Sequence, residues 1–162
     1  MTKRSGWMAL GLATVALTLA HQVSAQSQHV MQTAMEAKWG PAPPMVPPGA
    51  QIAVLSGDPS AAGPFAIRLK LPARYAVPAH SHPGDENVLV TTGALFMGMG
   101  DKLDKTKGQA LPIGGYAFMP ANMNHFAYTK QPTVIVIFGQ GPVDFKYVDP
   151  KDDPRNSPPA TK

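Results

Sequence analysis

Proline and glycine divide this chain into short segments, and this restricts its fold more than any other feature of the sequence. Of its 162 residues, 18 are proline and 15 are glycine, and both residue types disfavour helix interiors. The segments between them are rich in β-branched and aromatic residues, which favour strands. The expected strands are residues 52–56, 65–71, 86–92, 94–99, 116–119, 124–129, 133–138 and 143–148. Eight short strands separated by turns predict an all-β sandwich or barrel.

Two of these segments also show which faces are buried. In residues 65–71, large apolar side chains alternate with Ala, Arg and Lys, so one face is expected in the core and the other in water. Residues 133–138 are apolar on both faces. That pattern predicts a strand that is covered on both sides.

The first 25 residues have the composition of a secretory signal peptide. Lys3 and Arg4 precede residues 6–20, which carry no charge, and Val23 and Ala25 are small residues suited to a cleavage site. A retained membrane anchor is the alternative, but this apolar stretch is shorter than the ~20 residues that span a bilayer. We therefore expect an exported protein, periplasmic or secreted, that keeps no stable membrane anchor after cleavage.

The mature chain is expected to form one domain between two irregular ends. Residues 26–50 contain five prolines from position 39 onward, which predict an extended Pro-rich N-terminal arm along a sheet surface. Residues 51–148 hold all the expected strands and form the barrel. Residues 149–162 are polar and proline-rich and have no core-forming side chain, which predicts a mobile tail.

Charge and cysteine content exclude several classes of protein. The formal net charge of +4 includes two basic residues of the signal peptide, and no basic stripe remains without them. Nucleic acid is therefore not an expected partner. The absence of cysteine excludes disulfides, thiolate zinc sites and a cysteine nucleophile. No G-x-S-x-G motif of a serine hydrolase is present.

The histidines of the mature chain point to a metal site. His80 and His82 stand at i and i+2, so in a strand both side chains project from one face. Residues 83–85 (Pro-Gly-Asp) favour a turn, and Glu86 then opens the next strand. Such a hairpin can bring this carboxylate beside the two imidazoles. His125 follows a second strand and turn and completes the candidate ligand set.

Three imidazoles and one carboxylate suit one divalent transition metal: Fe, Mn, Ni, Co, Cu or Zn. When such an ion has five or six ligands, one or two positions stay open for water or a substrate. The alternative is an exposed polar hairpin that carries imidazoles by chance. His29 lies near the mature terminus without a paired ligand spacing, so we do not expect it to bind metal.

The same residues carry a resemblance to the cupin superfamily. Its first motif is G-x5-H-x-H-x3-E-x6-G, and the sequence matches it from His80 to Gly93. Its second motif is G-x5-P-x-G-x2-H-x3-N, whose spacing Gly114, Pro120 and His125 keep. The sequence also resembles small exported single-domain cupins that have a Trp-Gly-Pro-Ala-Pro arm, here residues 39–43, before the barrel.

Three positions depart from these motifs. Arg74 stands where the first motif begins with Gly, Asn122 where Gly follows Pro, and Thr129 in place of the final Asn. Because Asn tolerates the left-handed conformation that Gly usually serves, Asn122 is a mild change. Arg74 and Thr129 affect the expected geometry of the turns and not the ligands.

The resemblance implies a cupin-type jelly-roll β-barrel that acts on a small molecule with dioxygenase, isomerase or lyase chemistry. A non-catalytic module that binds a metal and senses a small ligand is the alternative, and a metal-free structural barrel is a third. Since cupins frequently pair, we expect a homodimer. Side chains on the metal-facing sides of the strands are expected to line the pocket, with Tyr128 or Gln140 orienting a ligand histidine or the substrate. The candidates are Val88, Val90, Met97, Met99, Phe118, Tyr128, Phe138 and Gln140.

Overall fold

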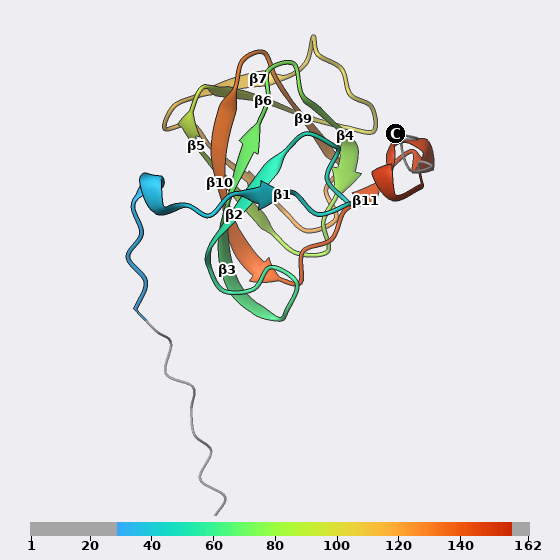
Figure 1. The fold of residues 1–162 in the computed structure, drawn as a ribbon. Helices are drawn as coiled ribbons and strands as arrows, with labels where there is room; N and C mark the ends of the chain where they lie inside the picture. Colours follow the sequence, from blue (N-terminus) through green and yellow to red (C-terminus); the bar gives the residue numbers. More distant parts are fainter. Residues whose placement is uncertain (1–28, 157–162) are drawn as a thin grey trace, which may run out of the picture.

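Two antiparallel sheets pack face to face into a jelly-roll barrel in the computed structural model, which describes residues 29–156 (Figure 1). The strand order is β1-β2-β3-β10-β5-β8 in the first sheet and β11-β4-β9-β6-β7 in the second. This arrangement confirms the all-β, cupin-type fold. The predicted signal peptide, residues 1–25, lies outside the described residues.

The elements are short, as the spacing of proline and glycine predicts. The first sheet contains β1 (Gly40–Pro41), β2 (Gln51–Ser56), β3 (Gly63–Leu71), β10 (Thr133–Gly141), β5 (Glu86–Thr92) and β8 (Tyr116–Met119). The second contains β11 (Lys146–Tyr147), β4 (Ala76–Ser81), β9 (His125–Thr129), β6 (Ala94–Met99) and β7 (Gln109–Pro112). Three 3-10 turns are η1 (Ala34–Glu36), η2 (Pro150–Asp152) and η3 (Pro154–Asn156). Within residues 29–156, no helix has the length and apolar character needed to cross a membrane.

The predicted strands agree with the structure except at four places. β5, β6 and β8 have the predicted bounds, and β2, β3, β9 and β10 differ at their ends by one to three residues. The segment predicted as 143–148 is a strand only at β11. The list of expected strands omits the two-residue β1. It also omits β4 and β7, which contain proline and few β-branched residues. These two strands form because β9 and β6 pair with them, which local preference does not reveal.

Alternation along β3 and β10 places the core between the sheets. Phe65, Ile67 and Leu69 of β3 are buried as predicted, and Ile135 and Ile137 of β10 pack in the same core. The prediction that residues 133–138 are covered on both sides is wrong. The outward side chain of Phe138 is 38% exposed, and the outward Val134 and Val136 are only partly buried.

The four turn positions of the two motifs all adopt left-handed backbone. The φ angles are 59° at Arg74, 76° at Gly93, 82° at Gly114 and 62° at Asn122. Asn122 therefore takes the conformation that its motif assigns to glycine, as predicted. Arg74 does so as well, although an arginine pays a steric cost there.

Thr129 holds the turn that contains Arg74. Its hydroxyl donates to the carbonyl of Pro72 at 2.6 Å and accepts from the backbone N–H of Tyr75 at 3.0 Å. The Thr129 N–H also donates to the Tyr75 carbonyl at 2.9 Å. Arg74 and Thr129, two of the three departures from the motifs, thus lie together. The threonine stabilises the turn in which arginine replaces glycine.

Replacing Arg74 with glycine is expected to stabilise the fold by roughly 0.5 kcal/mol. The left-handed conformation costs a non-glycine residue roughly 1–2 kcal/mol, and the entropy of glycine offsets about 0.5–1 kcal/mol of that. Gly93→Ala is the matched opposite change, because a Cβ there would lie 2.4 Å from the Pro132 carbonyl oxygen. We expect it to destabilise by about 2 kcal/mol or more. Urea unfolding measures the change in stability of both variants. An equal loss of stability in the two variants would contradict the assigned turn geometry.

The residues after Trp39 lie against the barrel. β1 pairs with β2, and the Nζ of Lys70 lies 4.2 Å from the ring centre of Trp39. The hydroxyl of Tyr75 donates to the Pro47 carbonyl, and that of Tyr147 to the Met45 carbonyl at 2.8 Å. This segment therefore closes one side of the barrel. Hydrogen bonds from two tyrosine hydroxyls to its backbone carbonyls hold it there.

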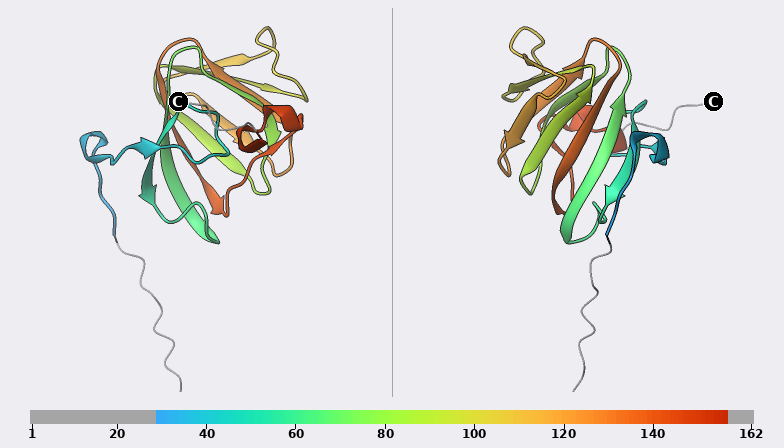
Figure 2. Two further views of the ribbon diagram at one scale, coloured as in Figure 1. Left: turned by 45° about the vertical axis from the view of Figure 1, so that its right-hand side comes forward. Right: turned by 90° about the vertical axis from the view of Figure 1, so that its left-hand side faces the viewer.

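The described part of the predicted tail has structure. η2 and η3 lie on a different side of the barrel from η1 (Figures 1 and 2). Arg155 donates to the Phe145 carbonyl at 2.7 Å and to the Asp144 carboxylate at 2.9 Å. Residues 149–156 are thus attached to the chain just before β11, and residues 157–162 lie outside the described part.

Candidate metal centre

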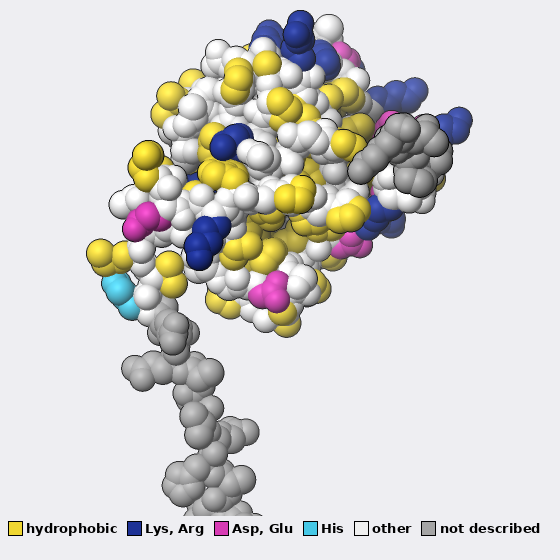
Figure 3. Space-filling model, in the orientation of Figure 1, with side chains coloured by type: hydrophobic (Ala, Val, Ile, Leu, Met, Phe, Trp, Pro, Cys, Tyr) yellow, Lys and Arg dark blue, Asp and Glu magenta, His cyan; other side chains and the backbone are white. Residues whose placement is uncertain are grey.

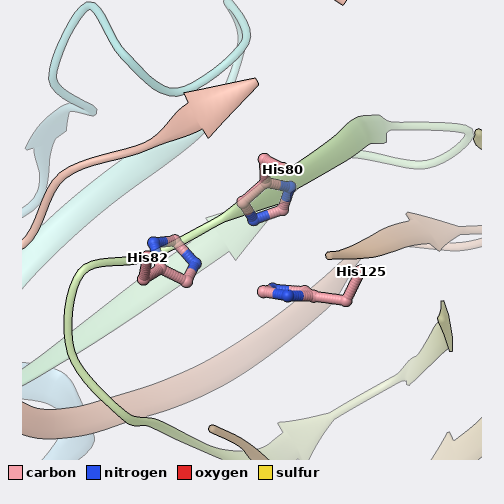
Figure 4. Close-up of side chains that lie close together, drawn as sticks. All are labelled: His80, His82 and His125. Carbon is pink, nitrogen blue, oxygen red and sulfur yellow. The ribbon is translucent and has the colours of Figure 1, made fainter. Parts of the chain in front are cut away.

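Two neighbouring strands bring the three candidate histidines together. His80 of β4 and His125 of β9 are direct partners across the sheet, and His82 is the first residue after β4. Figure 4 shows the three imidazoles directed toward one another. One nitrogen of each lies within 4.8 Å of the others, and all three side chains are buried. His29, by contrast, is exposed.

Backbone carbonyls fix the tautomer of every imidazole. The Nδ1 atoms of His80, His82 and His125 bond the carbonyls of Pro78 at 2.7 Å, Asp144 at 2.8 Å and Met123 at 3.0 Å. A carbonyl only accepts, so each Nδ1 carries the proton and each neutral ring keeps its lone pair on Nε2. Metal-binding imidazoles are held in this way.

Glu86 brings its carboxylate to the same point from the first sheet. Its Oε2 lies 3.6 Å from the Nε2 of His82 and 3.4 Å from the Nε2 of His125. The Nε2 of His82 is buried and has no hydrogen-bond partner, which is costly unless another group binds it. Three directed nitrogens and a carboxylate therefore fit a divalent transition metal.

Phe145 is a neighbour of the centre that the sequence does not single out. Its ring stacks on His80, with centroids 4.5 Å apart and planes 10° apart, and meets His82 edge-on at 4.6 Å. Arg155 holds the backbone of this residue. The only signal in the sequence is an apolar residue at every second position from 143 to 147, which does not show what the ring touches.

Burial and mutual contact shift the pKa values of these groups. Burial, followed by the charges of His125 and His82, lowers the pKa of His80 from 6.5 to about 3. Burial acts to raise the pKa of Glu86, but the hydrogen bond from His125 and the histidine charges outweigh it, so the pKa is lowered. Burial likewise acts to lower the pKa of His125, and contact with Glu86 outweighs it, so the pKa is raised.

The metal-free protein is expected to lose stability as the pH falls from 6.5 toward 3. Because His80 has a folded-state pKa of about 3, its neutral form contributes stability that is complete above 6.5 and lost on acidification. The ionised Glu86 also contributes stability that is lost as the pH falls, because its pKa is lowered. His125, whose pKa is raised, contributes stability below pH 6.5 and loses this contribution at higher pH. Melting curves of chelator-treated protein test this. His80→Asn should show a shallower fall with pH, and an unchanged slope would contradict the assignment.

Only some of the predicted pocket residues face the interior. Val88 and Met97 line a cavity of about 40 Å³ that also touches His80, Glu86 and His125. Val90 is buried in the core next to it. Gln140 lines a small cavity of about 20 Å³ together with His82 and Glu86.

The other four predicted pocket residues lie elsewhere, and the direction of the strands explains each case. Phe118 of β8 and Phe138 of β10 both pair with Asn87 of β5. They therefore lie on the same outward face of the sheet as Asn87 and are exposed. Tyr128 alternates with the inward Ala127, and its hydroxyl donates to the Lys105 carbonyl at 2.7 Å. Met99 is opposite His125 but ends β6, and it is 48% exposed.

A two-sheet β-barrel whose inward histidines and glutamate converge on one point defines the cupin class of protein. Within that class, the sequence model of the ChrR cupin-like domain family matches residues 26–144. The chain belongs to this family. Among curated proteins, no sequence matches it.

Solved structures share this fold at low sequence identity. The polyketide cyclase RemF from Streptomyces resistomycificus has a TM-score of 0.65 and 15% identity, over 78% of this chain and 90% of its own. A candidate acetylacetone dioxygenase from Methylibium petroleiphilum has a TM-score of 0.61 and 19% identity, over 82% and 89%. An RmlC-like cupin from Shewanella frigidimarina has a TM-score of 0.54 and 14% identity, over 71% and 92%. These likenesses concern the fold.

Proposed function

We propose that this protein is a metal-dependent cupin enzyme that acts on a small molecule. The observation that carries the proposal is the arrangement of the three Nε2 atoms. Each is directed at one buried point beside Glu86, while each Nδ1 donates to a backbone carbonyl. Two of the structural neighbours are described as a cyclase and a candidate dioxygenase, which supports small-molecule chemistry.

The residues around the centre limit the type of reaction. A divalent transition metal, when bound, supplies Lewis-acid or redox chemistry, and His80, His82, Glu86 and His125 would hold it. Apart from three of these ligands, the residues lining the interior cavity carry no ionisable side chain. A separate general acid or base is thus lacking among them, which favours chemistry at the ligand set itself. The apolar lining keeps water away from it.

A non-catalytic sensing module is the second candidate, and the same observation favours it. A site without a separate acid or base can also bind a small ligand reversibly without transforming it.

Metal analysis followed by a substrate screen tests both proposals. The purified protein should contain one divalent transition metal per chain. Oxygen uptake and product formation are then measured with small diketones, thiols, phenols and sugars, using His82→Ala as the metal-deficient control. Turnover that this control lacks supports the enzyme. Reversible ligand binding without turnover would contradict the enzyme and support the sensing module. A stable protein that contains no metal would contradict both and support a metal-free structural barrel.

We also propose that the protein is exported after removal of residues 1–25. N-terminal sequencing of the protein from its native host should begin at Gln26, and recovery of an intact Met1 would contradict this. The expected homodimer stays a prediction, and light scattering on the mature protein measures it.

A further inference from the structure

An apolar cavity of about 160 Å³ lies between the N-terminal arm and the barrel. On this face of the molecule, hydrophobic side chains gather in a hollow beside β1 and β2 (Figure 3). The partly buried Met45, Ile52 and Val143 form its outer wall, and the buried Ile67 and Phe145 form its inner wall. None of these residues belongs to the pocket that the sequence predicts.

The cavity reaches the metal centre at Glu86. That side chain lines both this cavity and the smaller one around His80 and His125. The other residues that line both cavities are Val46, Leu69, Ile137 and Phe145. A molecule held in the larger cavity would therefore lie beside the carboxylate of the metal centre.

The lining selects for a neutral molecule. Glu86 is the only ionisable side chain in it, and Ser60 is the only other polar one. An anion would lose its hydration there without a partner of opposite charge, which costs several kcal/mol. A cation would find only the Glu86 carboxylate, which already lies against His82 and His125. In size, the cavity is close to an engineered apolar cavity of about 150 Å³ that binds benzene.

The arm, which contributes Met45 to the outer wall, is held in place. The hydroxyl of Tyr147 binds the Met45 carbonyl, and that of Tyr75 binds the Pro47 carbonyl. The cavity is thus built from the arm and the barrel together, and a ligand does not have to order the arm on binding.

A polar depression that is lined by His82 and Phe145 also borders the centre, but it is a poorer site for a neutral, apolar molecule. It contains Arg155, whose guanidinium is already paired with Asp144 and Asp153. Lys146 also lines this depression, so its charged side chains favour a polar ligand over a hydrocarbon.

We propose that the cavity binds a neutral, mainly hydrocarbon molecule about the size of benzene or toluene and places it beside Glu86. The placement next to a metal rests on the proposed function, whereas binding in the cavity does not. Met45, Ile52 and Val143 would then determine which molecules enter.

Toluene is a suitable probe because it has no atom that binds a metal. Binding to the purified protein is followed by NMR titration, and metal content is measured in the same samples. Ile52→Trp fills the cavity, and Val143→Phe narrows it at a partly exposed position where folding is less at risk. Leu89→Trp, on the exposed outer face of β5, is the matched control.

We expect toluene to bind the wild type and Leu89→Trp equally, and both cavity variants at least tenfold more weakly. Metal content should be the same in all four proteins. Absence of toluene binding to the wild type, or binding of toluene to both cavity variants with wild-type affinity, would overturn the inference. Binding that depends on the cavity residues in a protein without metal would support the cavity and overturn the metal-dependent function instead.

Discussion

Replacing His82 with alanine is expected to remove stoichiometric metal and to lower the melting temperature by about 10 °C or more. A metal that binds only the folded state stabilises it by about 4 kcal/mol at 1,000 times its dissociation constant. For domains of this size range, each kcal/mol changes the melting temperature by roughly 2–8 °C. The variant loses the buried Nε2 that has no hydrogen-bond partner in the metal-free chain. Elemental analysis and thermal melting measure the two effects.

His29→Ala is the matched control for this experiment, since His29 is exposed and does not belong to the cluster of three histidines. It should keep the metal and the melting temperature of the wild type. Melting after chelation separates the loss of metal from damage to the fold, because wild type and His82→Ala should then melt much closer together. One metal per chain in the His82 variant would falsify the ligand assignment.

Replacing Glu86 with glutamine is expected to weaken metal binding by more than about 100-fold. Losing a partner that only orients a ligand already costs 10–100-fold in affinity, and Glu86 stands closer, with Oε2 within 3.6 Å of two ligand nitrogens. Glutamine keeps the shape of the side chain and removes its negative charge, so the change tests the carboxylate itself. Competition with a chelator of known affinity measures the effect.

Asp85→Asn is the matched control, because it removes the neighbouring charge at an exposed position. The Asp85 carboxylate accepts from the Ala121 N–H at 2.8 Å and does not face the histidines. Its metal affinity should equal that of the wild type. If Glu86→Gln also binds metal with wild-type affinity, the centre consists of the three histidines alone.

The candidate ligands could be predicted from the sequence because their spacing is local. His80 and His82 are two residues apart and Glu86 follows one turn later, so a single hairpin brings all three to one region. The alternation of β3 was predictable for the same reason. The positive φ of Asn122 followed from its place between proline and histidine in the second motif.

The pocket could not be predicted in the same way, because its wall depends on how the strands pair. Phe118 and Phe138 are apolar residues in correctly predicted strands, yet their pairing with Asn87 directs them outward. A shift of one residue reverses the face of every side chain in a strand. Met45 lines the cavity beside Glu86 because the arm folds back across the barrel, and Ile52 does so because β2 pairs with β3.

The hydrogen bonds of the three histidines divide between what the sequence determined by itself and what the tertiary structure decided. His80 and His125 donate to carbonyls two residues earlier in the chain, a contact within reach of the local backbone. His82 donates to Asp144, 62 residues away, in the same segment that places Phe145 against His80. The sequence determined which side chains can bind a metal, through their spacing. Packing between distant segments decided the direction of His82 and the shape of the cavity, because these contacts exist only after both sheets have assembled.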